Sequence, residues 1–303
     1  MGFAINLADE YLHMPTDQPY WRESLWLDAY DMSQDVGIVV YMHSRSGHRR
    51  GDVVVYATHA GQESQRLEAW DIPCSAVHVS DNQNGLTLAN IDFRVTRPGS
   101  AVRVTADTPA LMFDLAFDAY GPIFDYDWVD WTNSHHYEQF GRVTGKIRMA
   151  ARELQFIGSG TRDHAWGTRG QVNWQGWLWV TARFPTRAAW SICFMRADST
   201  QLFAYLLNET AHELDWATAE IRWEATSLIE AKIAGSAKGH TIDARIYPIA
   251  SIDLSGRDPT KRGTYLYYFI QVEDATLGRG VGLLDIFAPL GYPVHFAARQ
   301  ETR

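Results

Sequence analysis

The residues best placed to do chemistry lie in the stretch GSGTRDHAWGTRG, residues 158–170. A carboxyl group beside an imidazole can exchange protons with a bound molecule. Burial raises the pKa of such a carboxyl group, and a nearby Arg lowers it. The surrounding glycines predict a tight turn or bulge between strands. The alternative to a site is an ion pair between Arg162 and Asp163 that only stabilises this bulge. The candidate functional residues of this stretch are Arg162, Asp163, His164, Trp166 and Arg169.

A second polar group occurs in NSHHYEQFG, residues 133–141, which offers two histidines and a glutamate. His135 and Glu138 are three residues apart and would share a face on a helical turn. A metal site needs three or four ligands, and the sequence shows no HExxH motif and no paired CxxC. We therefore expect a buried hydrogen-bonding cluster here, formed by His135, His136 and Glu138. Neither zinc nor haem is expected in the chain.

Aromatic and acidic residues alternate in YWRESLWLDAYD, residues 20–31, which includes Trp21, Trp26 and Tyr30. The favoured interpretation is an aromatic strand that closes one end of a barrel. The alternative is part of a ligand-binding wall. The chain has 12 Trp, 14 Tyr and 13 Phe, and residues of these types favour strands and line apolar sites.

Composition excludes several classes of protein. The 303 residues carry a net charge of −9, which argues against broad binding to nucleic acid. No stretch approaches the 18 apolar residues of a membrane span, and the acidic start does not resemble a secretory signal, so we expect a cytoplasmic location. Cys74 and Cys193 are too few for a disulfide framework, and Cys193 is expected to be a buried thiol. GxSxG and phosphate-loop motifs are absent, and the glycines at 278, 280 and 282 do not have GxGxxG spacing, so a dinucleotide site is not expected.

Strand-like segments dominate both halves of the chain, and short strands at this spacing predict sandwiches or barrels. We expect two β domains, residues 1–140 and 141–303, because the segment around residues 130–150 interrupts the strand pattern. The best helical candidate is SHHYEQFGRVTGKI, which is broken by Gly141 and Gly145.

At GTRDHAWGTR the chain resembles the carotenoid 1,2-hydratase (hydroxyneurosporene synthase) superfamily, whose members carry an Asp-[His/Arg]-x-Trp-Gly element after a Gly-rich strand end. The resemblance is strongest to a bacterial branch of uncharacterised proteins. In that branch an HxEQ-like segment, here His136-Tyr137-Glu138-Gln139, precedes the element. The N-terminal W.ES.W.DAYD is also similar. So is a late GxGxG followed by an acid, here Gly278, Gly280, Gly282 and Asp285.

The resemblance implies a mostly β protein with two tandem lipocalin-like antiparallel barrels packed together around a hydrophobic pocket. Known activities in the superfamily include hydration of isolated terpenoid double bonds, and related tandem-lipocalin proteins cyclise hydrophobic polyketides. One fold can host several chemistries, so the reaction is not fixed by the resemblance.

We therefore expect a cofactor-independent lyase or isomerase that acts on a terpenoid, steroid-like or aromatic molecule by acid/base catalysis. It would be a hydratase, a dehydratase or a double-bond isomerase or cyclase. A non-catalytic lipocalin-like carrier and a purely structural protein are the alternatives. The sequence is compatible with a homodimer. The expected catalytic residues are Asp163, His164, His136 and Glu138. The expected substrate-binding residues are Trp21, Trp26, Tyr30, His135, Tyr137, Arg162, Trp166, Arg169, Trp177 and Trp179.

Overall fold

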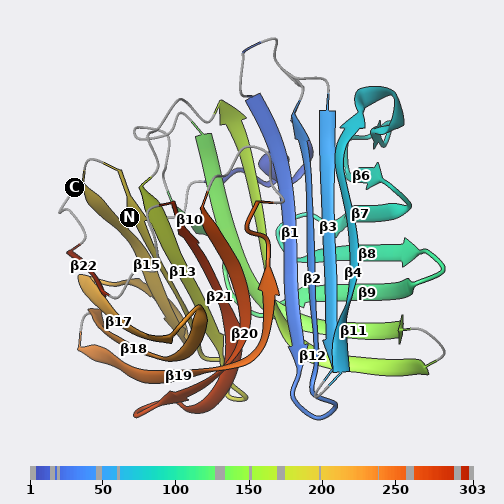
Figure 1. Cartoon of the computed structure of the whole chain (residues 1–303). Coiled ribbons are helices and arrows are strands. Elements are labelled where there is room, and N and C mark those ends of the chain that lie inside the picture. Colours follow the sequence, from blue (N-terminus) through green and yellow to red (C-terminus); the bar gives the residue numbers. More distant parts are fainter. Residues whose placement is uncertain are drawn as a thin grey trace. The chain divides into compact units, whose positions relative to one another are not determined.

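The fold is described from a computed structural model of the chain (Figure 1). The structure describes residues 5–13, 18, 21–45, 50–59, 62–126, 134–149, 152–168, 175–197, 199–237, 239–256, 263–289 and 295–299. Within these residues the regular structure is almost entirely β. The helical segments described are two short 3-10 turns, η1 (Leu7–Glu10) and η3 (Cys74–Ala76). The prediction of a mostly β chain is confirmed. In the described part of the chain, no helix is long and apolar enough to cross a membrane.

The chain divides into two compact units, Met1–Gln171 and Val172–Arg303. Each has its own antiparallel sheet and its own hydrophobic core. The sequence placed the boundary at residue 140, within a strand that pairs continuously with the next strand from Ser134 to Met149. A cut there would separate hydrogen-bonded neighbours, which is why the compact unit extends to residue 171.

The first unit holds a 12-stranded sheet in which neighbours in space are mostly neighbours in sequence. The exception is β1, which pairs with β12 and so joins the start of the unit to its end. In spatial order the strands are β4 (Gln62–Pro73), β3 (Arg50–His59), β2 (Val36–Arg45), β1 (Trp21–Asp31), β12 (Arg152–Thr168), β11 (Ser134–Met149), β9 (Leu111–Ala119), β8 (Ala101–Asp107), β7 (Ile91–Arg97), β6 (Gly85–Leu88) and β5 (His78–Val79), with β10 (Phe124–Asp125) beside β11.

The second unit holds a 10-stranded sheet built in the same manner. Here β13 pairs with both β14 and β21, so the first long strand again meets a late one. In spatial order the strands are β16 (Thr210–Glu213), β15 (Thr200–Asn208), β14 (Ala189–Arg196), β13 (Gly176–Arg183), β21 (Gly278–Ala288), β20 (Thr264–Asp274), β19 (His240–Asp253), β18 (Ser227–Ala237), β17 (Trp216–Glu224) and β22 (His295–Arg299).

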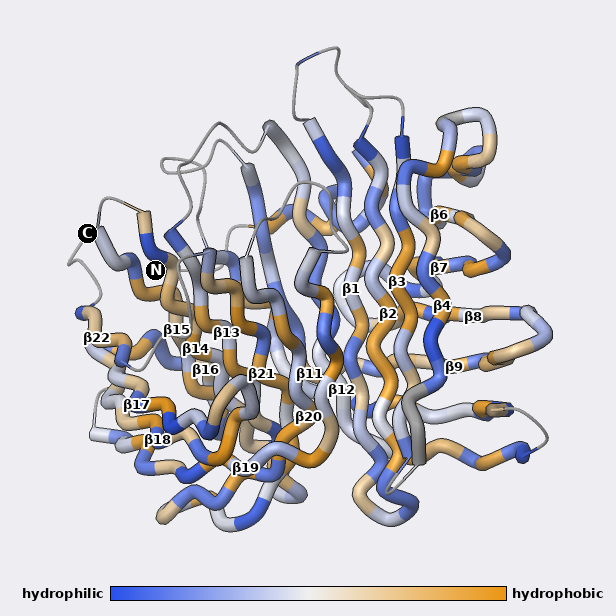
Figure 2. The backbone as a smooth tube through the Cα atoms, in the orientation of Figure 1, coloured by the Kyte–Doolittle hydropathy of each residue, from blue (hydrophilic) through white to orange (hydrophobic). Residues whose placement is uncertain are grey.

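Strand alternation gives β1, β2, β11 and β12 two chemically different faces. The core face carries Leu25, Leu27, Val40 and Met42, which belong to the hydrophobic core of the first unit. The opposite face carries the intervening residues of the same strands. Both faces of β1 are buried, because ten of its eleven positions, all but Arg22, are inaccessible to solvent. Figure 2 shows the strongly hydrophobic course of β2 and β3 in the same sheet.

Two segments fold differently from the sequence-based expectation. Residues 158–168 lie within the long strand β12 rather than in a turn, and residues 134–147 lie within β11 rather than in a helix. The glycines serve close packing between strands. A Cβ added at Gly160 would lie 2.6 Å from the carbonyl oxygen of Asp28 on β1, so a side chain there would push the two strands apart.

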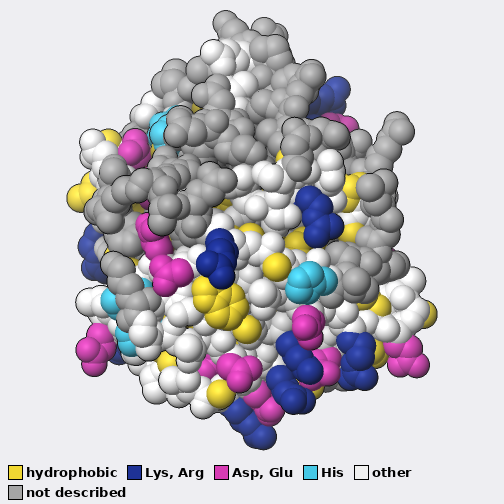
Figure 3. Space-filling model, turned by 90° about the vertical axis from the view of Figure 1, so that its left-hand side faces the viewer, with side chains coloured by type: hydrophobic (Ala, Val, Ile, Leu, Met, Phe, Trp, Pro, Cys, Tyr) yellow, Lys and Arg dark blue, Asp and Glu magenta, His cyan; other side chains and the backbone are white. Residues whose placement is uncertain are grey.

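The second unit shows mixed charge on its outer strands. Glu230 on β18 lies 3.3 Å from Arg222 on β17 and 3.6 Å from Arg245 on β19. On the face of the molecule drawn in Figure 3, acidic and basic side chains are intermixed rather than segregated by sign. Cys193 on β14 is fully buried, as its apolar surroundings in the sequence predict.

Candidate functional site

The strands distribute the predicted catalytic residues over two faces of one sheet. Asp163 and His164 are consecutive in β12, so their side chains point to opposite faces. Asp163 lies opposite Glu138, whereas His164 lies opposite Tyr137. Both residues were expected to be catalytic, but on opposite faces they cannot share one site, and the catalytic role of each stays a prediction. His135 and Glu138 also lie on opposite faces. Residues three apart share a face in a helix, but in a strand they point to opposite sides.

The opposite face contains a row of aromatic and acidic side chains that crosses four strands. Tyr41 on β2 is paired with Trp26 on β1, Trp26 with Asp163 on β12, and Asp163 with Glu138 on β11. The Trp26 and Tyr41 rings lie with their centroids 5.8 Å apart. Side chains paired in this way lie about 5 Å apart at their Cβ atoms. The two carboxyl groups thus share one end of the row, and the aromatic rings form the other.

His136 lies on the same face, next to this row. Its Nε2 lies 3.7 Å from Oδ2 of Asp163, and its ring contacts that of Tyr126 at 5.0 Å between centroids. Burial, together with the charges of His164 and Arg22, lowers the pKa of His136 well below its usual value. Its imidazole is therefore neutral near pH 7. The Tyr126 hydroxyl donates a hydrogen bond of 2.7 Å to Oε2 of Glu138. Asp163 keeps 16% of its side chain exposed, more than the 2% of His136.

A buried histidine–aspartate dyad lies on the same face, at residues that the sequence analysis did not select. Nε2 of His43 on β2 lies 2.5 Å from Oδ2 of Asp52 on β3, and Arg45 lies 2.8 Å from the same oxygen. Burial lowers the pKa of His43, although Asp52 acts in the other direction. The neutral ring therefore carries its proton on Nε2, facing the carboxylate. The other nitrogen, Nδ1, is buried and has no hydrogen-bond partner among the described residues.

Arg22 supplies a positive charge between the two histidines of the opposite face. Its charge lowers the pKa of both His43 and His136. It lies opposite Gly167 in β12 and retains partial exposure. A guanidinium group at such a place can stabilise negative charge that develops on a bound molecule.

The core face contains a separate polar cluster around a buried ion pair. Nη1 of Arg162 lies 2.9 Å from Oε2 of Glu10, and both side chains are almost completely buried. The Arg162 guanidinium also donates hydrogen bonds to Oε1 of Gln139 at 2.7 and 2.9 Å, and one of 3.3 Å to the Tyr137 hydroxyl. Burial raises the pKa of Glu10, but Arg162 more than offsets this, so the net pKa is lowered. Burial raises the pKa of Tyr137 well above its usual value.

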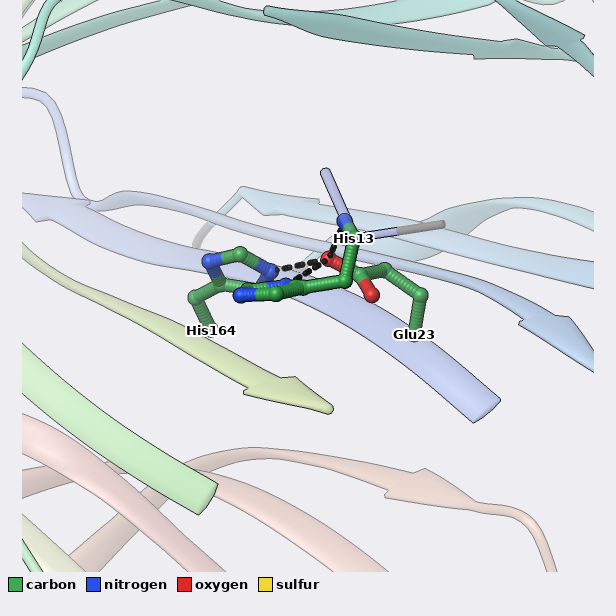
Figure 4. A group of neighbouring side chains, drawn as sticks. All are labelled: His13, Glu23 and His164. Atoms are coloured by element: carbon green, nitrogen blue, oxygen red, sulfur yellow. Dashed lines mark hydrogen bonds and ion pairs between the residues drawn. The ribbon is translucent and has the colours of Figure 1, made fainter. Parts of the chain in front are cut away.

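Glu23 joins two histidines at the end of this cluster (Figure 4). Its Oε1 lies 2.6 Å from Nε2 of His164 and 3.2 Å from Nδ1 of His13. The backbone N–H of His13 donates to the same oxygen at 3.2 Å. Burial opposes ionisation of Glu23, yet the two histidines lower its pKa below the usual value. The group therefore contains an ionised carboxylate at neutral pH.

Stacked rings border this histidine group. The Trp166 ring stacks on His13 at 4.2 Å and on His135 at 4.9 Å between centroids. Trp21 lies on the same strand face and is buried. Five of the substrate-binding residues expected from the sequence therefore lie on the core face: Trp21, His135, Tyr137, Arg162 and Trp166.

Other expected residues lie elsewhere. Tyr30 is on the opposite face, near the end of β1, where its hydroxyl donates to Asp35. Trp177 and Trp179 belong to the second unit, where their indole N–H groups donate to Asp285 at 2.9 Å and to Ser191 at 3.0 Å. Arg169 lies outside the described residues.

Sequence reasoning missed the residues that complete both clusters. Glu10 and His13 come from the N-terminal segment that precedes β1, whereas His43 and Asp52 reach the neighbourhood of β12 through the β12–β1–β2–β3 order of the sheet. A signal was present for one pair. His43 and Asp52 stand at matching positions of two strand-like segments joined by a short connection, and they are direct partners in the β2–β3 ladder.

The fold is that of a class of proteins with two antiparallel β sheets in tandem. A candidate AttH protein of Nitrosomonas europaea matches with a TM-score of 0.68 and 13% identity, covering 92% of this chain and 98% of that one. The structure of CghA with Sch210972 matches at 0.67 and 10% identity, over 89% of each chain. Kievitone hydratase from Nectria haematococca matches at 0.62 and 14% identity, over 88% of each chain. No curated protein sequence matches the chain.

Within that class, the family can be stated. The chain belongs to the family described as Domain of unknown function (DUF7064), whose model matches residues 6–265. The match covers most of both units. The expected two-sheet architecture is therefore confirmed by the fold, and the function has to be argued from the site.

Proposed function

We propose that this protein is a hydratase- or isomerase-type lyase that acts on a hydrophobic small molecule by general acid–base chemistry at the opposite face of the first sheet. The likeness in fold to kievitone hydratase, together with the resemblance of the RDHAWG element to carotenoid hydratases, supports this reaction class. At these identities fold alone does not define a reaction, so the proposal rests on the side chains.

The observation that carries the proposal is the His43–Asp52 dyad. A carboxylate that holds one imidazole nitrogen fixes the tautomer and leaves the other nitrogen as a base, as in catalytic triads. His43 has this arrangement, with Asp52 at Nε2 and an unpartnered Nδ1. Asp163 lies two strands away on the same face and two residues along from Ala165, the β12 residue level with His43, which corresponds to about 12 Å between the backbone positions at the usual strand spacing and rise. On β1, between these two strands, Trp26 pairs with Asp163 and Ser24 pairs with His43.

In the hydration direction the carboxyl group of Asp163 donates a proton to one carbon of a C=C bond. His43 Nδ1 takes a proton from the water whose oxygen bonds to the other carbon. The product has gained one water, and the two side chains return to their starting states when a proton passes through solvent from His43 to Asp163. Trp26 and Tyr41 present aromatic faces that stabilise developing positive charge on carbon.

In an isomerisation, His43 and Asp163 would act one after the other. His43 removes a proton from an activated carbon, the double bond shifts, and Asp163 delivers a proton at the far carbon. Arg22 stabilises negative charge on a conjugated oxygen during this step. His136 positions the Asp163 carboxyl group, because its Nε2 lies 3.7 Å from Oδ2. A terpenoid, steroid-like or aromatic substrate would suit the aromatic wall.

The experiment uses isotopically labelled water. The purified full chain is incubated with a panel of unsaturated polycyclic and aromatic ketones in water labelled with heavy oxygen and deuterium, and products are analysed by mass spectrometry. We expect incorporation of labelled water or of carbon-bound deuterium. His43→Gln should reduce the rate about 100-fold or more.

The matched control is His59→Gln on the adjacent strand β3, which should retain the wild-type rate. Binding of panel members without incorporation of either label would contradict the proposal and favour the non-catalytic carrier.

A further inference from the structure

We propose that His13, Glu23 and His164 form a binding site for a divalent transition-metal ion of the zinc type, on the core face of the first sheet. This site is separate from the proposed acid–base site, which lies on the other face of the same strands. It goes beyond the proposed function and does not depend on it. It departs from the sequence-based expectation of no zinc, which could not take account of three residues that are far apart in the chain and form no ligand motif.

The donor set is the first argument. The three residues offer two imidazole nitrogens and a carboxylate oxygen, and these ligand atoms all lie within 4.8 Å of one another. Two His and one Glu form one of the ligand sets that zinc uses when it keeps a fourth position for water. Figure 4 shows both imidazole rings directed at the same Glu23 oxygen. A zinc ion would replace the protons that the two imidazoles share with Glu23, and each ligand atom would then lie about 2 Å from the metal.

The unused carboxylate oxygen is the second and independent argument. The Glu23 side chain is only 4% exposed. Its Oε2 is buried and has no hydrogen-bond partner among the described residues. Leaving an ionised carboxylate oxygen buried without a partner costs free energy. A bound cation removes this cost, since it can take one or both oxygens of the carboxylate.

The surroundings supply the third argument, because both histidines are oriented through their second nitrogen. Nε2 of His13 lies 3.6 Å from Oδ1 of Asp9, and Nδ1 of His164 lies 3.4 Å from the Tyr137 hydroxyl. Histidine ligands of metals usually have such partners, which fix the tautomer and the ring orientation. The nearby positive charge of Arg162 is compensated by Glu10 at 2.9 Å, so it does not repel a cation at full strength.

Such an ion would attach the N-terminal segment to the sheet. His13 follows the turn η1, Glu23 comes from β1, and His164 comes from β12. One centre would thus join three segments, and its fourth position would hold a water molecule. The core-face aromatic residues Trp166 and Tyr137 border the group and limit access of bulk water.

The test measures zinc binding to the full chain after chelator treatment. Equilibrium dialysis against zinc, with metal analysis, should give one equivalent for the wild type, and zinc should raise the melting temperature. His13→Ala should weaken binding at least about tenfold, since even loss of an outer partner typically costs 10- to 100-fold. His13 is 25% exposed, so this variant is expected to fold. Asp9→Asn should cost about tenfold through the His13 ring.

The matched control is His135→Ala, which removes a neighbouring histidine that stacks on Trp166 but is not in the donor set. It should bind zinc as the wild type does. Substitution by cobalt gives a second readout, because a four-coordinate site produces visible absorption that His13→Ala should abolish. The proposal is overturned if the wild type takes up no zinc, or if His13→Ala and Glu23→Gln bind it unchanged.

Discussion

At the scale of single residues, burial sets the protonation of the two histidines on the opposite face. The pKa values of His43 and His136 are both lowered, the latter well below 6.5. In the unfolded chain both would titrate near pH 6.5. As the pH falls below about 6.5, the unfolded state therefore binds protons that the folded state does not, and the free energy of unfolding falls. Above that pH both states are neutral at these residues and their contribution is constant.

This predicts a loss of stability of up to about 1.4 kcal/mol per pH unit for each histidine between about pH 6.5 and its lowered folded pKa. Urea denaturation at several pH values measures it. His136→Gln should flatten the dependence, whereas His78→Gln at an exposed position should not. A wild-type stability that is constant over this range would show that the two imidazoles are not held neutral by the fold.

The buried ion pair between Glu10 and Arg162 on the core face is expected to contribute to stability. Removing one partner leaves a buried charge without compensation, so Glu10→Gln should destabilise the fold by about 3–5 kcal/mol. The comparison is Asp118→Asn, whose partner Arg97 is 67% exposed, and an exposed pair contributes about 0–1 kcal/mol. Chemical denaturation of both variants checks the difference. Equal effects would mean that Gln139 and Tyr137 satisfy Arg162 without Glu10.

At the scale of elements, the long strand β12 determines how the chemistry is distributed. Its alternation sends Arg162 and His164 to the core face and Asp163 to the other. The sequence predicted that these residues matter together but assigned them to a turn, where alternation does not apply. The turn was expected because the stretch contains four glycines, at positions 158, 160, 167 and 170. Glycines mark turns more often than close contacts between strands.

Close packing of β12 against β1 at Gly160 can be tested by substitution. Gly160→Ala places a methyl group 2.6 Å from the Asp28 carbonyl oxygen and 2.7 Å from a methyl group of Val143. The β1–β12 contact would have to open, and overpacking of this kind costs about 1–3 kcal/mol. Ser159→Ala at the adjacent position should change stability by less than about 0.5 kcal/mol. Thermal or chemical denaturation distinguishes the two, and a neutral Gly160→Ala would contradict the close-packing explanation.

Much of the fold could be predicted from sequence, and the site only in part. Short β-branched segments are a local signal, so the strand-rich character of both halves was recognised. Asp163, His136 and Glu138, all named as catalytic candidates from the sequence, lie close together because β11 and β12 are adjacent in the chain; their catalytic roles stay a prediction. Pairing of β1 with β12 is a long-range contact without a local signal. His13, Glu23 and His43 could therefore not be placed beside these strands.

At the scale of the whole molecule, each of the two units has its own core. The first unit needs β11 and β12, since β12 pairs with β1 and β11 pairs with β9. A fragment of residues 1–171 should therefore fold cooperatively, whereas a fragment of residues 1–140 should not. Circular dichroism with thermal melting checks both fragments. A folded 1–140 fragment would restore the boundary expected from the sequence.

The measurement that tests the central claim most directly compares Asp163→Asn with the wild type in three respects: melting temperature, affinity for a panel member that the wild type transforms, and turnover in labelled water. The substitution keeps the size of the side chain but removes its proton. The account predicts an unchanged affinity, a melting temperature close to that of the wild type, and a loss of most turnover. Glu153→Gln, at an exposed position of the same strand, should match the wild type in all three. A variant at residue 163 that turns over the substrate at the wild-type rate would contradict the account.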